Sequence, residues 1–291
     1  MWNILTKQFY RQRKDFDDLC AGRDAGLTFP EGVICSTDIA YADDGIKAHV
    51  LDIYRPEDSQ EKILPVIINV HGGGLIIGNK EFNRYFCALL CKKGFLVYSI
   101  EYRLIPDCLI YDQLADVFMA MDYIKERLAA DGGDSSHVYM AGDSGGACLI
   151  TYANAIQNST NIARAANVTP SGLRINALGL ISGMFYTSRF DKIGLFLPKY
   201  LYGRDYKKTS FAKYVNPENR ELLNSLAPSH NDFLRRYTTD FEKALTRAER
   251  EHELVDFPKN KKLTHAFSVF EPFLPESSAV IDMMVEYLRK F

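Results

Sequence analysis

Short runs of β-branched and aromatic residues alternate along the chain with longer segments whose apolar residues recur at helical spacing. The short runs have the composition of buried parallel strands and lie at 65–70, 95–102, 136–142 and 175–182. The segments with helical spacing lie at 83–94, 111–133 and 146–158. This alternation predicts one α/β domain over 1–291, with a mostly parallel central sheet and helices on both of its faces.

Composition and charge narrow the class of protein. The 291 residues are 47% apolar, which is enough for a large buried core. A net charge of −2 with interspersed acidic and basic residues argues against a nucleic-acid partner. The N-terminal residues lack the apolar stretch of a secretory signal, and no run of about 18 apolar residues is present to span a membrane. We therefore expect a soluble, cytoplasmic protein without stable membrane insertion, and the sequence leaves a homodimer open.

The cysteines give no sign of a metal or redox centre. Cys87 and Cys91 are four residues apart in a predicted helix, and no paired His or Cys ligands accompany them at metal-binding spacing. All six cysteines lie in apolar segments, at Cys20, Cys35, Cys87, Cys91, Cys108 and Cys148. Buried reduced thiols are the expected state, and we expect neither a metal nor a cofactor.

The pentapeptide Gly-Asp-Ser-Gly-Gly at 142–146 carries the first candidate chemistry. It follows a predicted strand and precedes a predicted helix, which is the setting of a nucleophile elbow, a sharp turn that presents Ser144 at the carboxyl edge of the sheet. The helix directs its N-terminal amides toward charge that develops beside the hydroxyl. A β-barrel serine protease carries the same pentapeptide among strands, with its catalytic His earlier in the chain, and the predicted helices disfavour it. An ordinary glycine turn is the other alternative.

Three consecutive glycines follow His71, directly after the strand predicted at 65–70. Such a run costs backbone entropy unless the chain must approach another group closely. Its N–H groups suit an oxyanion hole, in which two or three donors bind the negative oxygen of a tetrahedral intermediate. A phosphate-binding loop is the rival interpretation, but the Lys-Ser/Thr ending and the G-x-G-x-x-G frame of such loops are missing. We expect His71 to orient the loop through hydrogen bonds.

Taken in order, the motifs resemble the hormone-sensitive-lipase-like branch of the α/β-hydrolases. The matching segments are LDIYRP at 51–56, HGGG at 71–74, EYRLIPD at 101–107, GDSGG at 142–146 and LTHAFSVFEPFLPES at 263–277, and the resemblance covers roughly 33–291. The resemblance implies an α/β-hydrolase fold. It also implies an oxyanion hole of backbone N–H groups, which in this chain fall on Gly73, Gly74 and Gly145, with Gly72 adjacent.

Three histidines follow Ser144 in the chain, namely His230, His252 and His265. His252 lies in a charged helix end that leads into a strand, and we interpret it as a surface residue. His265 lies in a loop between that strand and a helix, in the segment where the resembling family places its catalytic His. Neutral imidazole accepts the serine proton and returns it to the leaving alcohol. We therefore predict His265 as the general base.

The acid that orients the base is expected between Ser144 and His265. The segment 229–245 resembles the Asp-Phe-Leu stretch of the same family and nominates Asp232, whereas Asp240 falls inside the following helix and is interpreted as a surface residue. Asp232 would hold the imidazole in one tautomer. The family has a strongly apolar strand before this acid, but here Pro228 and three polar residues precede it. Either this strand is very short or residues are absent from the chain.

Two further segments, 1–32 and 183–225, are predicted to form a helical cap over the site. The first is amphipathic, and the second inserts aromatic and basic residues between strands of the core. Within the resembling family such caps accept small esters. The sequence therefore predicts a serine carboxylic ester hydrolase that acts on small acyl or aryl esters through an acyl-Ser144 intermediate. Amide or aryl-formamide hydrolysis at the same site and a non-catalytic fold that binds small molecules are the alternatives.

Overall fold

The computed structural model describes residues 2–59, 62–189, 197–232, 236–257 and 261–291. Within these ranges eight strands form one sheet in the order β1-β2-β4-β3-β5-β6-β7-β8. β2 pairs antiparallel with both β1 and β4, and the other neighbours are parallel. The strands are β1 Val33–Ala40, β2 Val50–Pro56, β3 Leu64–Val70, β4 Leu96–Ile100, β5 Gly133–Asp143, β6 Ala177–Ile181, β7 Ser229–Asp232 and β8 His252–Val255. The mostly parallel sheet predicted from the sequence is confirmed.

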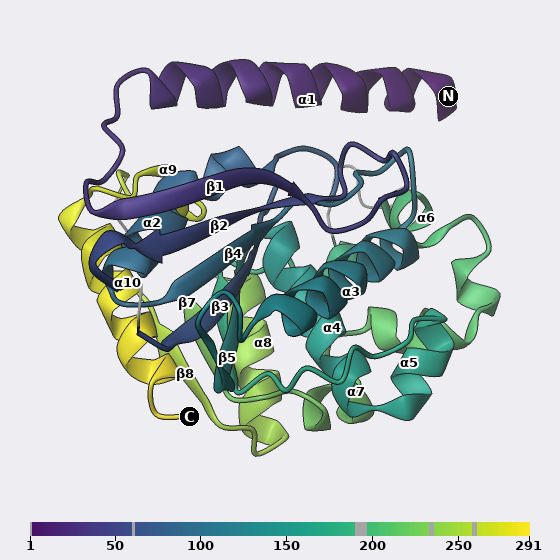
Figure 1. Ribbon diagram of the computed structural model, residues 1–291. Helices are drawn as coiled ribbons and strands as arrows, with labels where there is room; N and C mark the ends of the chain where they lie inside the picture. Colours follow the sequence, from purple (N-terminus) through teal and green to yellow (C-terminus); the bar gives the residue numbers. More distant parts are fainter. Residues whose placement is uncertain (1, 60–61, 190–196, 233–235, 258–260) are drawn as a thin grey trace.

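Helices cover both faces of the sheet (Figure 1). In β3, Ile68 and Val70 join the core formed with α3 and α4, whereas Ile67 packs with α2 and α10. Because both faces are buried, the central strands are apolar throughout rather than alternating. The α-helices are α1 Trp2–Asp24, α2 Arg84–Lys92, α3 Ile110–Arg127, α4 Gly145–Asn158, α5 Thr160–Ala166, α6 Leu197–Tyr202, α7 Arg220–Asn224, α8 Arg236–Arg247, α9 Phe267–Phe270 and α10 Pro275–Leu288.

The carboxyl ends of the parallel strands carry the residues singled out by the sequence. β3 ends immediately before His71, and β5 ends immediately before Ser144. β7 ends at Asp232 and is only four residues long, with all four side chains buried despite their polarity. Because parallel strands place their carboxyl ends at one edge, these residues lie on the same side of the sheet.

α1 lies across the molecule at the top of Figure 1, separate from the sheet. Polar contacts hold its second half: Asn79 Nδ2 donates to Asp17 Oδ1 over 3.1 Å, and Arg23 Nη2 donates to a backbone carbonyl over 3.0 Å. In its first half, Phe9 packs edge to face on Tyr200 of α6, with ring centroids 5.0 Å apart. The two segments expected to form the cap, 1–32 and 183–225, therefore contact each other. Residues 190–196 lie outside the described ranges.

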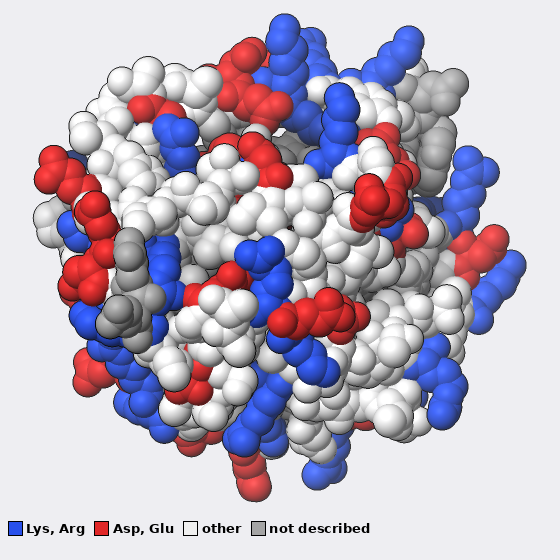
Figure 2. All heavy atoms as spheres, viewed as in Figure 1, with Lys and Arg blue, Asp and Glu red and all other residues white. Residues whose placement is uncertain are grey.

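The molecular surface carries both signs of charge. Figure 2 shows Lys and Arg interspersed with Asp and Glu over the face in view. None of the helices in the described ranges combines the length and hydropathy that a membrane span requires.

Candidate active site

Ser144 occupies the sharp turn between β5 and α4, with φ 49° and ψ −111°. A positive φ is strained for a residue with a side chain and persists only where surrounding contacts hold it. Here the Ser144 N–H donates to the Ile181 carbonyl over 2.8 Å. The turn needs small neighbours, since a Cβ on Gly142 or on Gly146 would lie 2.9 Å or 2.0 Å from the Val70 carbonyl oxygen. The turn therefore has the shape of a nucleophile elbow.

The glycine loop after β3 shares a cavity with Ser144. Gly73 has φ +104° and Gly74 has φ +61°, and a Cβ on Gly73 would lie 1.9 Å from the Ile77 carbonyl oxygen. Within the described residues the N–H groups of Gly73 and Gly74 have no backbone acceptor. The N–H of Gly145 belongs to the first turn of α4, where helix geometry leaves donors unpaired. These three groups are available to a bound oxygen atom.

Gly72 does not share this role. Its N–H donates to Asp143 Oδ1 over 2.9 Å and is already paired. Asn83 Nδ2 donates to the same oxygen, also over 2.9 Å. Gly72, which the sequence placed beside the expected oxyanion donors, therefore offers no free N–H and instead links the loop to the residue before Ser144.

His71 holds the glycine loop in place. Its Nδ1 donates to the Gly72 carbonyl over 2.9 Å, and its Nε2 donates to the Glu101 carboxylate over 3.1 Å. The ring stacks on Tyr102 with centroids 4.3 Å apart. Both partners are acceptors, so both ring nitrogens carry hydrogen. Burial alone lowers the pKa of His71, but the Glu101 carboxylate outweighs it and the pKa lies above the ordinary value. The orienting role expected for His71 is confirmed.

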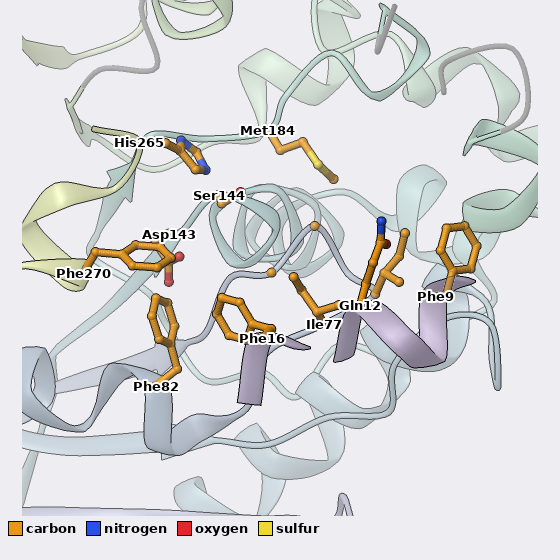
Figure 3. Close-up of a pocket in the computed structure, with 13 residues that line it drawn as sticks. Phe9, Gln12, Phe16, Ile77, Phe82, Asp143, Ser144, Met184, His265 and Phe270 are labelled. Carbon is orange, nitrogen blue, oxygen red and sulfur yellow. The ribbon is translucent and has the colours of Figure 1, made fainter. Parts of the chain in front are cut away.

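His265 lies in the loop before α9 and lines the same cavity as Ser144. Figure 3 shows its ring on the side of Ser144. His265 is an exposed residue, yet surrounding protein atoms desolvate its ring and lower the pKa of His265, while the Asp143 carboxylate opposes that shift. A lowered pKa keeps imidazole neutral near pH 7, which is the form that accepts a proton. Within the described residues its ring makes no hydrogen bond to Ser144 or to Asp232.

Asp232 is buried beside the loop that carries His265. Its Oδ1 accepts from the Ser182 N–H over 2.6 Å, and its Oδ2 accepts from Ser268 Oγ over 3.4 Å. Ser182 Oγ in turn accepts from the Ala266 N–H over 3.1 Å. The carboxylate thus contacts the chain that follows His265. Its oxygens bind Ser182 and Ser268, whereas the sequence led us to expect a hydrogen bond to the imidazole. Burial raises the pKa of Asp232 to about 7.

The cavity at Ser144 has a volume of about 310 Å³ and mostly apolar walls. α1 contributes Phe9, Gln12 and Phe16 (Figure 3). Phe16 packs on Phe82 with ring centroids 5.0 Å apart, and Phe82 packs on Phe270 at 4.5 Å. Ligand-binding cavities range from about 300 to 1,000 Å³, so this one lies at the small end of that range.

The other two candidate histidines lie outside the cavity. His230 is buried within β7, where desolvation lowers its pKa to about 4. His252 begins β8, and its Nδ1 donates to the Arg250 carbonyl over 2.7 Å. Neither lines the cavity that contains Ser144.

The cysteines are unpaired, and most of them are buried. Burial raises the pKa of Cys20 and Cys35 to about 11, which keeps these thiols protonated. The residues that the structure describes contain no group of three or more His, Cys, Asp or Glu side chains placed to hold a metal ion.

Two polar residues of the cavity were missed by the sequence analysis. Asp143 is buried between the glycine loop and Asn83, and its carboxylate lies near His265. Its position directly before Ser144 was the available signal. Gln12 interrupts the apolar stripe of α1, and that interruption is visible in the sequence.

The fold is that of the α/β-hydrolases. Residues 51–181 match the family model BD-FAE. The resemblance to α/β-hydrolase esterases drawn from the sequence motifs is confirmed.

Curated relatives match parts of the chain. A probable isoprenylcysteine alpha-carbonyl methylesterase of Oryza sativa subsp. japonica is 29% identical over 191 residues, which are 62% of this chain and 46% of the relative. The amyloplastic tuliposide A-converting enzyme b1 of Tulipa gesneriana is 30% identical over 131 residues, which are 40% of this chain and 35% of that enzyme. The chain thus spans less than half the length of either relative.

Solved structures share the fold over nearly the whole chain. Esterase B from Lactobacillus rhamnosis has a TM-score of 0.91 and 21% identity, over 99% of this chain and 95% of that chain. A bacterial heroin esterase has a TM-score of 0.73 and 22% identity, over 98% and 92% of the two chains. At these identities the likeness shows the fold, and the predicted α/β-hydrolase fold is confirmed.

Proposed function

We propose that the protein hydrolyses small carboxylic esters through a covalent acyl-Ser144 intermediate, with His265 as the general base. One observation carries the proposal: Ser144, in its strained turn, shares a single cavity with His265, Gly73 and Gly74. Among the described residues, the N–H groups of these two glycines have no backbone acceptor. The esterase names of the curated relatives support the same class of reaction. The chemistry needs only these groups and water.

In the first half of the reaction, Ser144 Oγ attacks the ester carbonyl carbon while the imidazole of His265 takes the hydroxyl proton. The carbonyl oxygen becomes negative and accepts hydrogen bonds from the N–H groups of Gly73, Gly74 and Gly145. The carbon–oxygen bond to the alcohol then breaks, and His265 gives its proton to the leaving oxygen. Ser144 is left as an acyl ester.

The second half repeats these steps with water. His265 takes a proton from water as the water oxygen attacks the acyl carbon, and the same N–H groups bind the new oxyanion. The bond to Ser144 Oγ breaks, and the serine oxygen receives the proton from His265. The carboxylic acid leaves and the free enzyme returns.

Asp232 is our candidate for the acid that orients His265. Its support is its place in the chain between Ser144 and His265 and its contacts to Ser182 and Ser268, which hold the backbone after the imidazole. The Asp143 carboxylate is a negative charge close to the same ring. The Asp143 charge favours the imidazolium that forms during attack.

Labelling with a fluorophosphonate tests the proposal, because only an activated serine reacts with it. We expect wild-type protein to gain one adduct on the peptide that contains Ser144, and Ser144→Ala to gain none. A folded wild-type protein that stays unlabelled would refute the mechanism and favour a non-catalytic binding fold. Turnover of an aryl ester beside the matching aryl formamide then separates ester from amide preference.

A further inference from the structure

The inward face of α1 is apolar except at one position. Residues Leu5, Phe9, Gln12, Phe16 and Cys20 follow one another at intervals of three and four and so share a face of the helix. Phe9, Phe16 and Cys20 are buried in the core. Gln12 stands at the centre of this stripe, where an apolar residue would pack at lower cost.

The side chain of Gln12 faces the cavity rather than a partner within the protein. Figure 3 shows it near Phe9 and Ile77, and it lines the cavity that contains Ser144. Within the described residues its amide makes no hydrogen bond. Gln12 is partly exposed, so water reaches its amide while the cavity is empty. A substrate that displaces this water leaves the amide without a partner unless the substrate offers a hydrogen-bonding atom of its own.

The neighbouring residue holds Gln12 in position. Arg13 Nε donates to the Ile76 carbonyl over 2.8 Å, and its Nη2 donates to the Ile105 carbonyl over 2.7 Å. Its Nη1 also pairs with Asp107 over 2.7 Å. These contacts fix the middle of α1 against the loops beside the site, so the backbone that carries Gln12 is held at the cavity before a substrate arrives.

We propose that Gln12 binds a second oxygen atom of the substrate, in addition to the carbonyl oxygen bound by the glycine N–H groups. It would thereby select neutral esters that carry another hydroxyl or carbonyl oxygen away from the scissile ester. This inference rests on the proposed ester hydrolysis. The Gln12 amide donates to such an oxygen and also accepts from a hydroxyl. Partial esters of polyols and neutral diesters belong to this class. A free carboxylate is disfavoured, because the cavity walls are apolar and Asp143 brings negative charge.

The aromatic cluster of Phe16, Phe82 and Phe270 favours an apolar part of the substrate. Phe16 lies four residues after Gln12, which is about 6 Å along the helix axis. There it packs with Phe82 and Phe270 and offers no polar group. One end of a bound substrate therefore meets only rings, and the second oxygen belongs at the Gln12 end.

Matched substrates and an isosteric variant test the role of Gln12. In the first pair, hexyl butyrate and ω-hydroxypentyl butyrate, a hydroxyl replaces the terminal methyl group of the alcohol part. In the second pair, ethyl octanoate and ethyl ω-hydroxyheptanoate, a hydroxyl replaces the terminal methyl group of the acyl part. Gln12→Met keeps the length of the side chain and removes the amide. Gln8→Met, at an exposed position of the same helix, is the control.

In at least one pair we expect Gln12→Met to lower kcat/KM for the hydroxylated ester by about three- to tenfold, the equivalent of one neutral hydrogen bond. The alkyl ester should stay within about twofold of wild type, and Gln8→Met should change neither member. Equal losses on both members of each pair, or no loss at all, would overturn the role of Gln12. Gln12→Leu repeats the test if Gln12→Met does not fold.

Failure of the proposed ester hydrolysis gives a different result from failure of the Gln12 role. If wild-type protein hydrolyses none of the four esters and resists fluorophosphonate, then ester hydrolysis itself is wrong. If all four are hydrolysed and the variant shows no preference change, then ester hydrolysis stands and only the role of Gln12 is wrong.

Discussion

The N–H of Gly72 donates to Asp143 Oδ1 over 2.9 Å and so joins the glycine loop to the residue before Ser144. The two residues are 71 positions apart in the chain, and Asn83 Nδ2 strengthens the link by donating to the same oxygen. Hydrogen bonds to a buried carboxylate are stronger than those between neutral groups. The donors of the loop are therefore held at a set position relative to the serine.

Replacing Gly73 by Ala should distort the glycine loop and leave the rest of the site largely unchanged. The new Cβ would lie 1.9 Å from the Ile77 carbonyl oxygen and would sit on a backbone with φ +104°. The backbone must shift, which misaligns the N–H donors, so we expect kcat for ester hydrolysis to fall about 10²-fold or more with a smaller change in KM. Steady-state kinetics on one small ester measure both constants. A change confined to KM would assign the loop to ordinary substrate binding.

Asp143→Asn tests the charge near His265 while retaining Oδ1, the atom that accepts from Gly72 and Asn83. The Asp143 carboxylate raises the pKa of His265, so removing its charge should lower that pKa further. The acidic limb of the plot of kcat/KM against pH reports the pKa of the general base in the free enzyme. This limb should therefore move to lower pH in the variant. An unchanged limb, or one displaced to higher pH, would exclude this electrostatic link.

Asp232 should make stability depend on pH. Burial raises its pKa from 3.8 to about 7, so the folded state favours the protonated carboxyl. The stability that this group contributes is complete below its ordinary pKa and is lost as pH rises toward 7. The loss is about 4 kcal/mol in free energy of unfolding.

Urea unfolding of wild type and Asp232→Asn at pH 4 and pH 8 measures this loss, since asparagine does not titrate. We expect the variant to gain stability relative to wild type at the higher pH. An equal difference between the two proteins at both pH values would show that the carboxyl does not titrate in this range.

The catalytic role of Asp232 needs a separate measurement. If Asp232 orients His265, Asp232→Asn presents the wrong hydrogen-bonding partner, and activity should fall about 10⁴-fold. Ser268→Ala, which removes one hydroxyl from the same carboxylate, should cost far less. Comparable losses in both variants would mean that Asp232 only supports the loop.

Much of the fold was visible in local patterns. Buried strands such as Leu64–Val70 are continuous apolar runs because both faces of the sheet are covered, and the glycines around Ser144 mark a turn that only small residues permit. The polar sequence before Asp232 also indicated a short strand, and β7 has only four residues.

The contacts within the site were less visible. The pairing of Gly72 with Asp143 joins residues from two different strand ends, and no local pattern encodes it. The orientation of His265 depends on a loop in which Ala266 adopts φ 51° and donates to Ser182, a residue 84 positions earlier. Long-range packing of this kind decides which carboxylate meets an imidazole, so Asp232 could be nominated from the sequence while its contacts could not.

The hydrolysis rate of a small ester by Ser144→Ala tests whether Ser144 forms a covalent bond with the substrate. Because the nucleophile, base and donors act as a unit, we predict a loss on the order of 10⁴- to 10⁶-fold in kcat. Thermal unfolding should show that the variant is folded, since the exchange removes a single hydroxyl. A folded Ser144→Ala protein that keeps the wild-type rate would contradict the acyl-Ser144 mechanism.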